Sequence, residues 1–138
     1  MTVLIDTNVI LDHILMRKNS ETARDCLEWL CINKHKSYLT SNIITDIYYF
    51  VQRELKNPAK SKDVIAKLLN AFQVVNVDKT DCVNALHVGF DDYEDGLAFV
   101  CAKKIKAGFI ITQNTGDYAN STIQALTPAD FIAKFNQK

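Results

Sequence analysis

The chain opens with MTVLIDTN (residues 1–8), in which a short apolar run ends at an aspartate. Val3, Leu4 and Ile5 lack the polar alternation of a half-exposed strand, so they predict a strand buried on both faces, as in a parallel sheet covered by helices. A carboxylate at the end of such a strand is costly to bury unless a ligand or hydrogen-bond donors compensate its charge. Asp6 is therefore the first candidate for a functional residue.

Strand and helix patterns alternate along the rest of the chain. Apolar residues at three- and four-residue spacing predict helices, with caps expected at Ser20, at Ser41 or Asn42, and at Thr127-Pro128. This alternation favours an α/β three-layer sandwich with a central, mostly parallel sheet of four to five strands flanked by helices. The predicted strands span residues 3–5, 37–40, 72–77, 109–112 and 123–126, and the predicted helices span residues 20–33, 42–55, 59–71, 79–88, 92–107 and 128–135.

Length and charge set broad limits on the class of protein. The 138 residues fit one domain covering residues 1–138. Lys plus Arg and Asp plus Glu both number 16, so composition alone does not indicate a nucleic-acid partner. No apolar run approaches the roughly 20 residues needed to cross a bilayer, and no signal peptide is recognisable. We therefore expect a cytoplasmic protein without membrane contact.

The four cysteines give little support for a zinc site. Cys26, Cys31, Cys82 and Cys101 form no Cys-x-x-Cys pair, and the histidines lie far from them in the sequence. We expect reduced, mostly buried thiols.

Oxygen-bearing side chains follow several of the predicted strands. In open α/β sheets the ligand site lies beyond the carboxyl ends of the strands. Singly, most of these residues are ordinary helix-cap or turn residues, but together they are the hard oxygen ligands that Mg²⁺ or Mn²⁺ prefers. Such ions activate nucleophiles and stabilise phosphoryl charge. The residues concerned are Asp6 after the first strand, Asp46 after the second, Asp92 and Asp95 on one face at a helix start, and Asn114 and Asp117 after the fourth strand.

Four stretches resemble, in order, the four motifs of PIN domains. They are DTNVILD (residues 6–12), TDIYY (45–49), DYEDGL (92–97) and TQNTGDY (112–118). The resemblance covers nearly the whole chain and implies a parallel sheet, a divalent metal ion and endoribonuclease activity, often as a VapC-like toxin. From it we expect Mg²⁺ or Mn²⁺ as cofactor, RNA as substrate, a cognate antitoxin as partner and a homodimer.

The resemblance also implies roles for individual residues. Asp46 stands where much of the family has glutamate, so its shorter side chain is expected to act through a bound water. Asn114 occupies a position that is often aspartate, which lowers the charge of the site by one. The implied catalytic residues are Asp6, Asp46 and Asp95; the metal ligands are Asp6, Asp46, Asp92, Asp95 and Asp117; and the residues that position water or substrate are Asn8, Thr112, Asn114 and Arg17.

Two other functions stay open at this point. The departures at Asp46 and Asn114 are compatible with a PIN-like module that binds nucleic acid or protein without cleaving. A phosphotransferase of the haloacid-dehalogenase type also begins with an aspartate after a buried strand, but it needs a second acid where this chain has Asn8. Tyr48, Tyr49 and Phe50 are expected in the core or a dimer contact, or stacked on bases, and His13 on the surface rather than as a general base.

Overall fold

The structure, a computed structural model, describes residues 1–136 of the chain. Its elements follow in the order β1 (Thr2–Ile5), α1 (Thr7–Ile14), α2 (Ser20–Ile32), β2 (Lys36–Thr40), η1 (Ser41–Ile43), α3 (Ile44–Leu55), α4 (Pro58–Ala71), β3 (Gln73–Val75), α5 (Lys79–Ala85), α6 (Tyr93–Lys104), β4 (Phe109–Ile111), η2 (Thr115–Tyr118), β5 (Gln124–Leu126) and α7 (Pro128–Phe135), where η marks a short 3-10 helix.

All five strands pair in parallel, in the order β3-β2-β1-β4-β5. Strand β1 is central, with Val3 opposite Ser37 of β2 on one side and Phe109 of β4 on the other. The chain first builds outward through β2 and β3, and then returns to the other side of β1 with β4. The strand order therefore reverses between β1 and β4, which is where open α/β sheets bind ligands. The expected α/β fold is confirmed.

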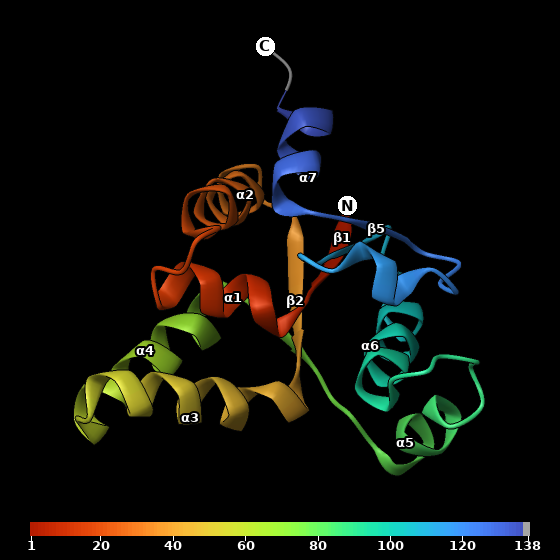
Figure 1. Cartoon of the computed structure of the whole chain (residues 1–138), viewed down its shortest axis with the longest axis horizontal. Coiled ribbons are helices and arrows are strands. Elements are labelled where there is room, and N and C mark those ends of the chain that lie inside the picture. Colours follow the sequence, from red (N-terminus) through yellow and green to blue (C-terminus); the bar gives the residue numbers. More distant parts are fainter. Residues whose placement is uncertain (137–138) are drawn as a thin grey trace.

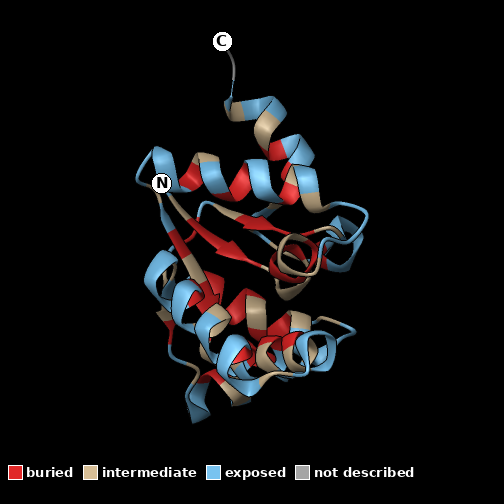
Figure 2. Ribbon diagram, turned by 90° about the vertical axis from the view of Figure 1, so that its left-hand side faces the viewer, coloured by how far each residue is buried: buried red, intermediate tan, exposed pale blue. Residues whose placement is uncertain are grey.

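Helices cover both faces of the sheet. Helices α1 to α4 and α7 lie on one side, and α5 and α6 lie on the other (Figure 1). Along β1, Val3 and Ile5 pack into the core under the first group, whereas Leu4 packs into the core shared with α6. Buried residues accordingly line the strands and the inner helix faces, and exposed residues line the outer faces (Figure 2). Burial on both faces explains why the opening run shows no polar alternation.

Helix α1 was not predicted from the sequence. Its residues Thr7–Ile14 directly follow the first strand, with Asp6 at the N-cap position. Four consecutive residues, Val9 to Asp12, are buried, because the helix packs against both α2 and α3 as well as the sheet. The helix has only eight residues, and its apolar residues Val9, Ile10 and Leu11 are consecutive, so periodicity does not distinguish this short run from a strand.

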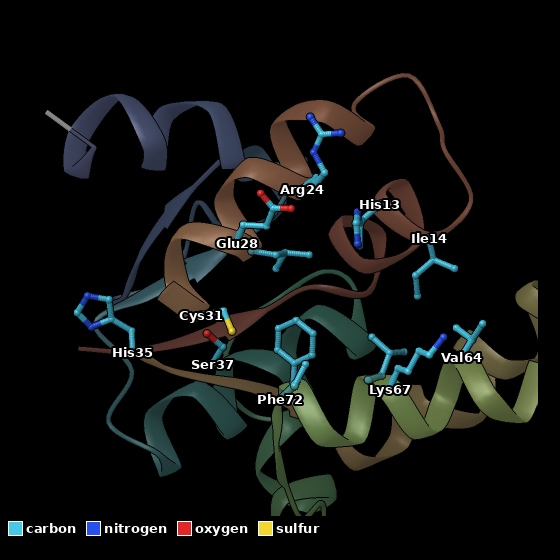
Figure 3. A pocket seen from close by; sticks show the side chains of 13 residues that line it. His13, Ile14, Arg24, Glu28, Cys31, His35, Ser37, Val64, Lys67 and Phe72 are labelled. Carbon is cyan, nitrogen blue, oxygen red and sulfur yellow. The ribbon is translucent and has the colours of Figure 1, made fainter. Parts of the chain in front are cut away.

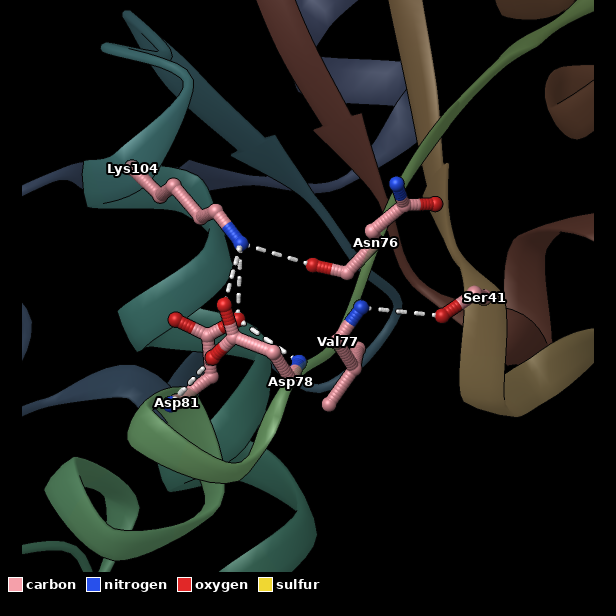
Figure 4. Close-up of polar contacts among 6 residues, drawn as sticks. All are labelled: Ser41, Asn76, Val77, Asp78, Asp81 and Lys104. Carbon is pink, nitrogen blue, oxygen red and sulfur yellow. Dashed lines mark hydrogen bonds and ion pairs between the residues drawn. The ribbon is translucent and has the colours of Figure 1, made fainter.

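Two of the expected helix caps were wrong. Ser20 is the first residue of α2, and Asn19 occupies its N-cap position without a side-chain cap bond. Ser41 and Asn42 form η1, and α3 begins only at Ile44. The Ser41 hydroxyl has another partner, because it accepts a hydrogen bond from the backbone N–H of Val77 at 3.0 Å (Figure 4). The Thr127-Pro128 cap is confirmed, with Thr127 accepting from the N–H of Asp130.

The third strand is shorter than predicted, because it ends at Val75 rather than at residue 77. Side chains, in place of a neighbouring strand, bind the backbone of the next two residues. Beyond β3, the carbonyl oxygen of Asn76 accepts a hydrogen bond at 2.8 Å from the Lys104 ammonium of α6 (Figure 4). The same ammonium lies 2.8 Å from an Asp81 carboxylate oxygen and 3.7 Å from one of Asp78. Lys104 thus ties α6 to the segment after β3. The next helix, expected over residues 79–88, ends at Ala85.

The cysteines differ partly from expectation. All four are free, and Cys26 and Cys101 are buried. Cys82 is partly buried and Cys31 is exposed, so the expectation of mostly buried thiols holds for only half of them. In the part of the chain that the structure describes, no helix is both long enough and apolar enough to cross a membrane.

Candidate functional site: a carboxylate groove at the switch point

A groove of about 360 Å³ lies beyond the carboxyl ends of β1 and β4. Helices α1, α3 and α6 and the loop after β4 contribute its walls. It collects every predicted site residue except Thr112. Its lining consists of Asp6, Thr7, Asn8, Leu11, Arg17, Asp46, Phe50, Asp92, Glu94, Asp95, Asn114 and Asp117.

A hydrogen bond across the switch point holds Asp6. The Thr112 hydroxyl, at the end of β4, donates to Asp6 Oδ2 at 2.8 Å and accepts from the N–H of Asn114 at 3.1 Å. Burial raises the pKa of Asp6, and the hydrogen bond from Thr112 acts in the opposite direction. Thr112 itself is fully buried. Its hydroxyl therefore orients Asp6, in place of the expected contact with water or substrate.

The start of α6 supplies three acids. Asp92 is the N-cap, and its Oδ1 accepts from the N–H of Asp95 at 2.9 Å. The cap interpretation of Asp92 is thus confirmed, although the residue also lines the groove. Burial, followed by the charges of Asp92, Asp117 and Asp6, raises the pKa of Asp95 to about 6.

Glu94 is a groove residue to which the sequence analysis gave no role. Burial raises the pKa of its carboxyl group, as does the charge of Asp46, which is the next largest cause. Glu94 and Asp95 are adjacent in sequence, and neighbours on a helix do not normally share a face. The signal that could have found Glu94 is its place between two acids in the first turn, where side chains reach around the helix end toward the same groove.

The remaining predicted residues reach the groove from separate elements. Asp46 is exposed in the first turn of α3, and Asp117 is exposed in η2. Among the lining residues, Arg17 is the only lysine or arginine. Its guanidinium lies 5.9 Å from the centre of the Phe50 ring, and that of Arg53 lies 5.6 Å from the same ring. The groove thus has an acidic floor and one cationic, aromatic rim.

The donor set fits a hard divalent cation. Its ligand atoms are carboxylate oxygens, and their mutual repulsion is the kind that a bound cation relieves. Within residues 1–136, however, no three His, Cys, Asp or Glu side chains are gathered closely enough to hold an ion as they stand. Like charges in a groove spread apart, so the side chains would have to turn inward around a metal.

A second pocket, of about 370 Å³, lies between α2, α4 and the start of β2 and has a different character (Figure 3). Its walls are mostly apolar, including Leu27, Val64 and Phe72. His13 lines this pocket, so it lies outside the carboxylate groove. Glu28 is the only acid among the residues that line this pocket.

Together, the fold and the groove define a class: a doubly wound α/β protein with a carboxylate cluster at its switch point. The chain belongs to the PIN-domain family, since the family model described as PIN domain matches residues 2–116. Because the chain belongs to the PIN-domain family, it is not a phosphotransferase of the haloacid-dehalogenase type. Ribonuclease VapC1 of Aquifex aeolicus (strain VF5) is 28% identical over 140 residues, which cover 97% of this chain and 95% of that protein.

Solved structures of toxin–antitoxin proteins share the fold. VapBC2 from Rickettsia felis, bound to a promoter DNA fragment, matches with a TM-score of 0.72 and 15% identity over 92% of this chain and 98% of that chain. FitAcB from Neisseria gonorrhoeae matches with a TM-score of 0.70 and 20% identity, with the same shares of the two chains covered. Mycobacterium tuberculosis VapC20, titled a sarcin–ricin loop cleaving toxin, gives 0.62 at 14% identity over 78% of this chain and 86% of that chain.

The raised pKa of Asp95 predicts that the metal-free protein becomes less stable as the pH rises. Because this pKa is about 6 in the folded state against 3.8 ordinarily, Asp95 contributes full stability below pH 4, and that contribution is lost as the pH rises through 6. Asp95→Asn should therefore melt close to wild type at pH 4 and about 2–4 °C higher at pH 7 in EDTA.

The matched control for this comparison is Asp91→Asn, an exposed neighbour that does not line the groove. Its melting temperature should track wild type at both pH values. A pH-independent difference between Asp95→Asn and wild type would contradict the assigned electrostatics.

Proposed function

We propose that this chain is a metal-dependent endoribonuclease that hydrolyses RNA phosphodiesters with Mg²⁺ or Mn²⁺, and that it is the toxin of a type II toxin–antitoxin pair. One observation carries the proposal: six carboxylates from four parts of the chain line a single groove at the switch point of the sheet. The similarity to a protein named Ribonuclease VapC1 supports the choice of RNA. Residence in the cytoplasm and a single domain over residues 1–138 remain part of the proposal.

Asp6 and Asp95 are the residues we assign to direct metal contact, because both are partly buried at the floor of the groove. Asp46, Asp92, Asp117 and the newly found Glu94 would complete the site. A bound divalent ion would lower the pKa of a water molecule and stabilise charge on the phosphate. Until such an ion binds, Thr112 keeps Asp6 oriented, and Asp92 fixes the first turn of α6 that presents Asp95.

On the substrate side, Arg17 is the residue that would meet phosphate. An acidic groove repels a polyanion, so one cation at its rim has a strong influence on approach. Stacking over Phe50 holds the guanidinium in place without neutralising its charge. Asn8 and Asn114 offer uncharged donors beside it.

A module that binds without cleaving remains the second candidate function. Asp46 has a short side chain, Asn114 carries no charge, and no three acids are gathered closely enough for an ion within residues 1–136. The two candidates differ in whether the purified protein cleaves RNA when manganese is present.

For the protein partner, we propose an antitoxin that covers the apolar pocket between α2 and α4 (Figure 3). A toxin–antitoxin complex from Klebsiella pneumoniae and VapBC2 from Rickettsia felis are among the structural neighbours. The pocket is mostly apolar, which suits an apolar segment of a partner. A homodimer is part of the proposal too, supported by apolar residues on α3 and α4, namely Ile44, Tyr48, Ile65 and Leu69.

The nuclease proposal predicts that Asp6→Asn lowers manganese-dependent cleavage of RNA by more than about 100-fold, because the change preserves volume and removes a charge that the metal needs. Wild type should also gain roughly 2.7 kcal/mol of stability at a metal concentration 100 times Kd. Cleavage is measured on gels under single-turnover conditions, and stability by thermal melting.

Asp25→Asn, on the exposed face of α2, is the control for these assays and should keep full activity. Cleavage by Asp6→Asn at the wild-type rate, or a wild-type melting temperature unmoved by millimolar manganese, would overturn the nuclease assignment.

A second prediction concerns Arg17. If its guanidinium contacts substrate phosphate, Arg17→Ala should lower kcat/KM by about 10- to 100-fold, mostly through KM, which is the range expected for losing a hydrogen bond to a charged group. Lys18→Ala is the matched control, since Lys18 is its exposed neighbour and does not line the groove. Equal kinetics of the two variants would show that Arg17 does not touch the substrate.

The partner proposal is tested by co-expression with the short protein that we expect the neighbouring open reading frame to encode. Val64→Glu places a charge in the apolar pocket and should reduce co-purification at least about 10-fold, because the partner would have to bury an unpaired carboxylate. Lys60→Glu, exposed near the start of the same helix, should leave it unchanged. Full retention by Val64→Glu would place the partner elsewhere.

A further inference from the structure

Tyr118 has a buried hydroxyl group without a hydrogen-bond partner. Among buried side-chain polar atoms within residues 1–136, only Tyr118 Oη and Gln113 Nε2 are in this situation. The residue lies in η2 and is 4% exposed, and its ring packs edge-on against Phe90 with the ring centres 6.0 Å apart. Buried polar atoms are nearly always paired, so an orphaned hydroxyl requires a physical explanation.

A small cavity of about 20 Å³ provides one. It lies beneath the carboxylate groove, between the ends of β1 and β2 and the first turn of α6, and Tyr118 is part of its wall. This volume exceeds the roughly 10–15 Å³ that one water molecule requires. The polar residues around it are Asp6, Thr7, Thr40, Asn42, Glu94 and Asp95.

The cavity therefore joins the orphaned hydroxyl to two of the acids assigned to the metal. Tyr118, Asp6 and Asp95 all line this cavity. Asp6 already uses one oxygen, Oδ2, to accept from Thr112. A water in the cavity would have a donor in Tyr118 and acceptors in the carboxylates, enough partners to hold it in place.

We propose that Tyr118 is a positioning residue of the groove: its hydroxyl donates to a water held in this cavity, and the water fixes the inward oxygens of Asp6 and Asp95. Thr112 and this water would then restrain Asp6 from two sides. The inference rests on the proposed function in one respect, namely that these carboxylates are the metal-binding ones. Partners that orient metal ligands typically change affinity or activity by about 10- to 100-fold when removed.

The competing explanation is that Tyr118 only fills the core and its cavity is dry. In that case the hydroxyl is a pure cost, and phenylalanine would be the better residue. The two explanations predict opposite signs for the effect of Tyr118→Phe on stability, which makes this isosteric change a sharp test.

The experiment compares wild type, Tyr118→Phe and the control Tyr38→Phe, a partly buried tyrosine that packs against the same core cluster but does not line the cavity. Metal-free melting temperatures are measured in EDTA, and Mn²⁺ dissociation constants by calorimetric titration. We expect Tyr118→Phe to melt about 2–5 °C lower and to bind Mn²⁺ about 10-fold more weakly. Tyr38→Phe should show neither effect, and a crystal structure of wild type should show a water within hydrogen-bond distance of Tyr118 Oη.

A Tyr118→Phe variant that melts at or above wild type, or that binds Mn²⁺ as tightly, would overturn the proposal. So would a crystal structure without density in the cavity. Failure of the proposed function is distinguishable, because wild type would then not cleave RNA in the presence of Mn²⁺, while the metal-free melting temperatures and the crystallographic water would still decide the role of Tyr118.

Discussion

The parallel pairing of β1 with β4 is the constraint on which the site depends. It places the C-terminal end of β1 beside that of β4, so that Asp6 and Thr112 can meet although 106 positions separate them. The backbone N–H of Asp6 also donates to the carbonyl of Ile111, which continues the ladder of the sheet to the aspartate itself. Most other groove residues lie on α1, α3 or α6 or in the segment after β4. Loss of this register would shift Asp6 relative to all of them.

The groove concentrates repulsion that the rest of the fold avoids. By contrast, the acids at the start of α5 have a cation beside them: Lys104 lies against Asp81 and lowers the pKa of that carboxyl group. In the groove, burial and neighbouring acids raise the pKa values of Asp6, Glu94 and Asp95 together, with one arginine along the rim. A site that is unfavourable in isolation and relieved by a cation is typical of functional carboxylates. The hydrophobic cores on the two sides of the sheet offset the stability that is lost through repulsion in the groove.

Much of the architecture could be predicted because local patterns and tertiary context agree. The apolar run of β1, the Thr127-Pro128 helix start, and the order of strands and helices all appear in the structure near their expected positions. The misses have different causes. Ser41 caps no helix because it bonds Val77, and α1 was missed because it has only eight residues and its apolar residues are consecutive. Glu94 was missed because helical spacing separates it from Asp95, whereas the groove reaches around the helix end.

Two pairs of aspartates have the same sequence pattern but different surroundings in the structure. Asp78 and Asp81 open α5, and Asp92 and Asp95 open α6, each pair at the same three-residue spacing with the first residue as N-cap. The sequence by itself determined the alternation that builds the sheet and the helix start at Thr127-Pro128, because caps and periodicity are properties of neighbouring residues. The motif resemblance assigned Asp92 and Asp95 to the site, but only the tertiary structure decided what surrounds each pair of acids. Lys104, in the last turn of α6, lies against the first pair and offsets its charge. The second pair instead has Asp6 and Asp117 near it, and their charges raise the pKa of Asp95 further. The pKa of a carboxyl group depends on the groups that surround it in space, which the local sequence does not show.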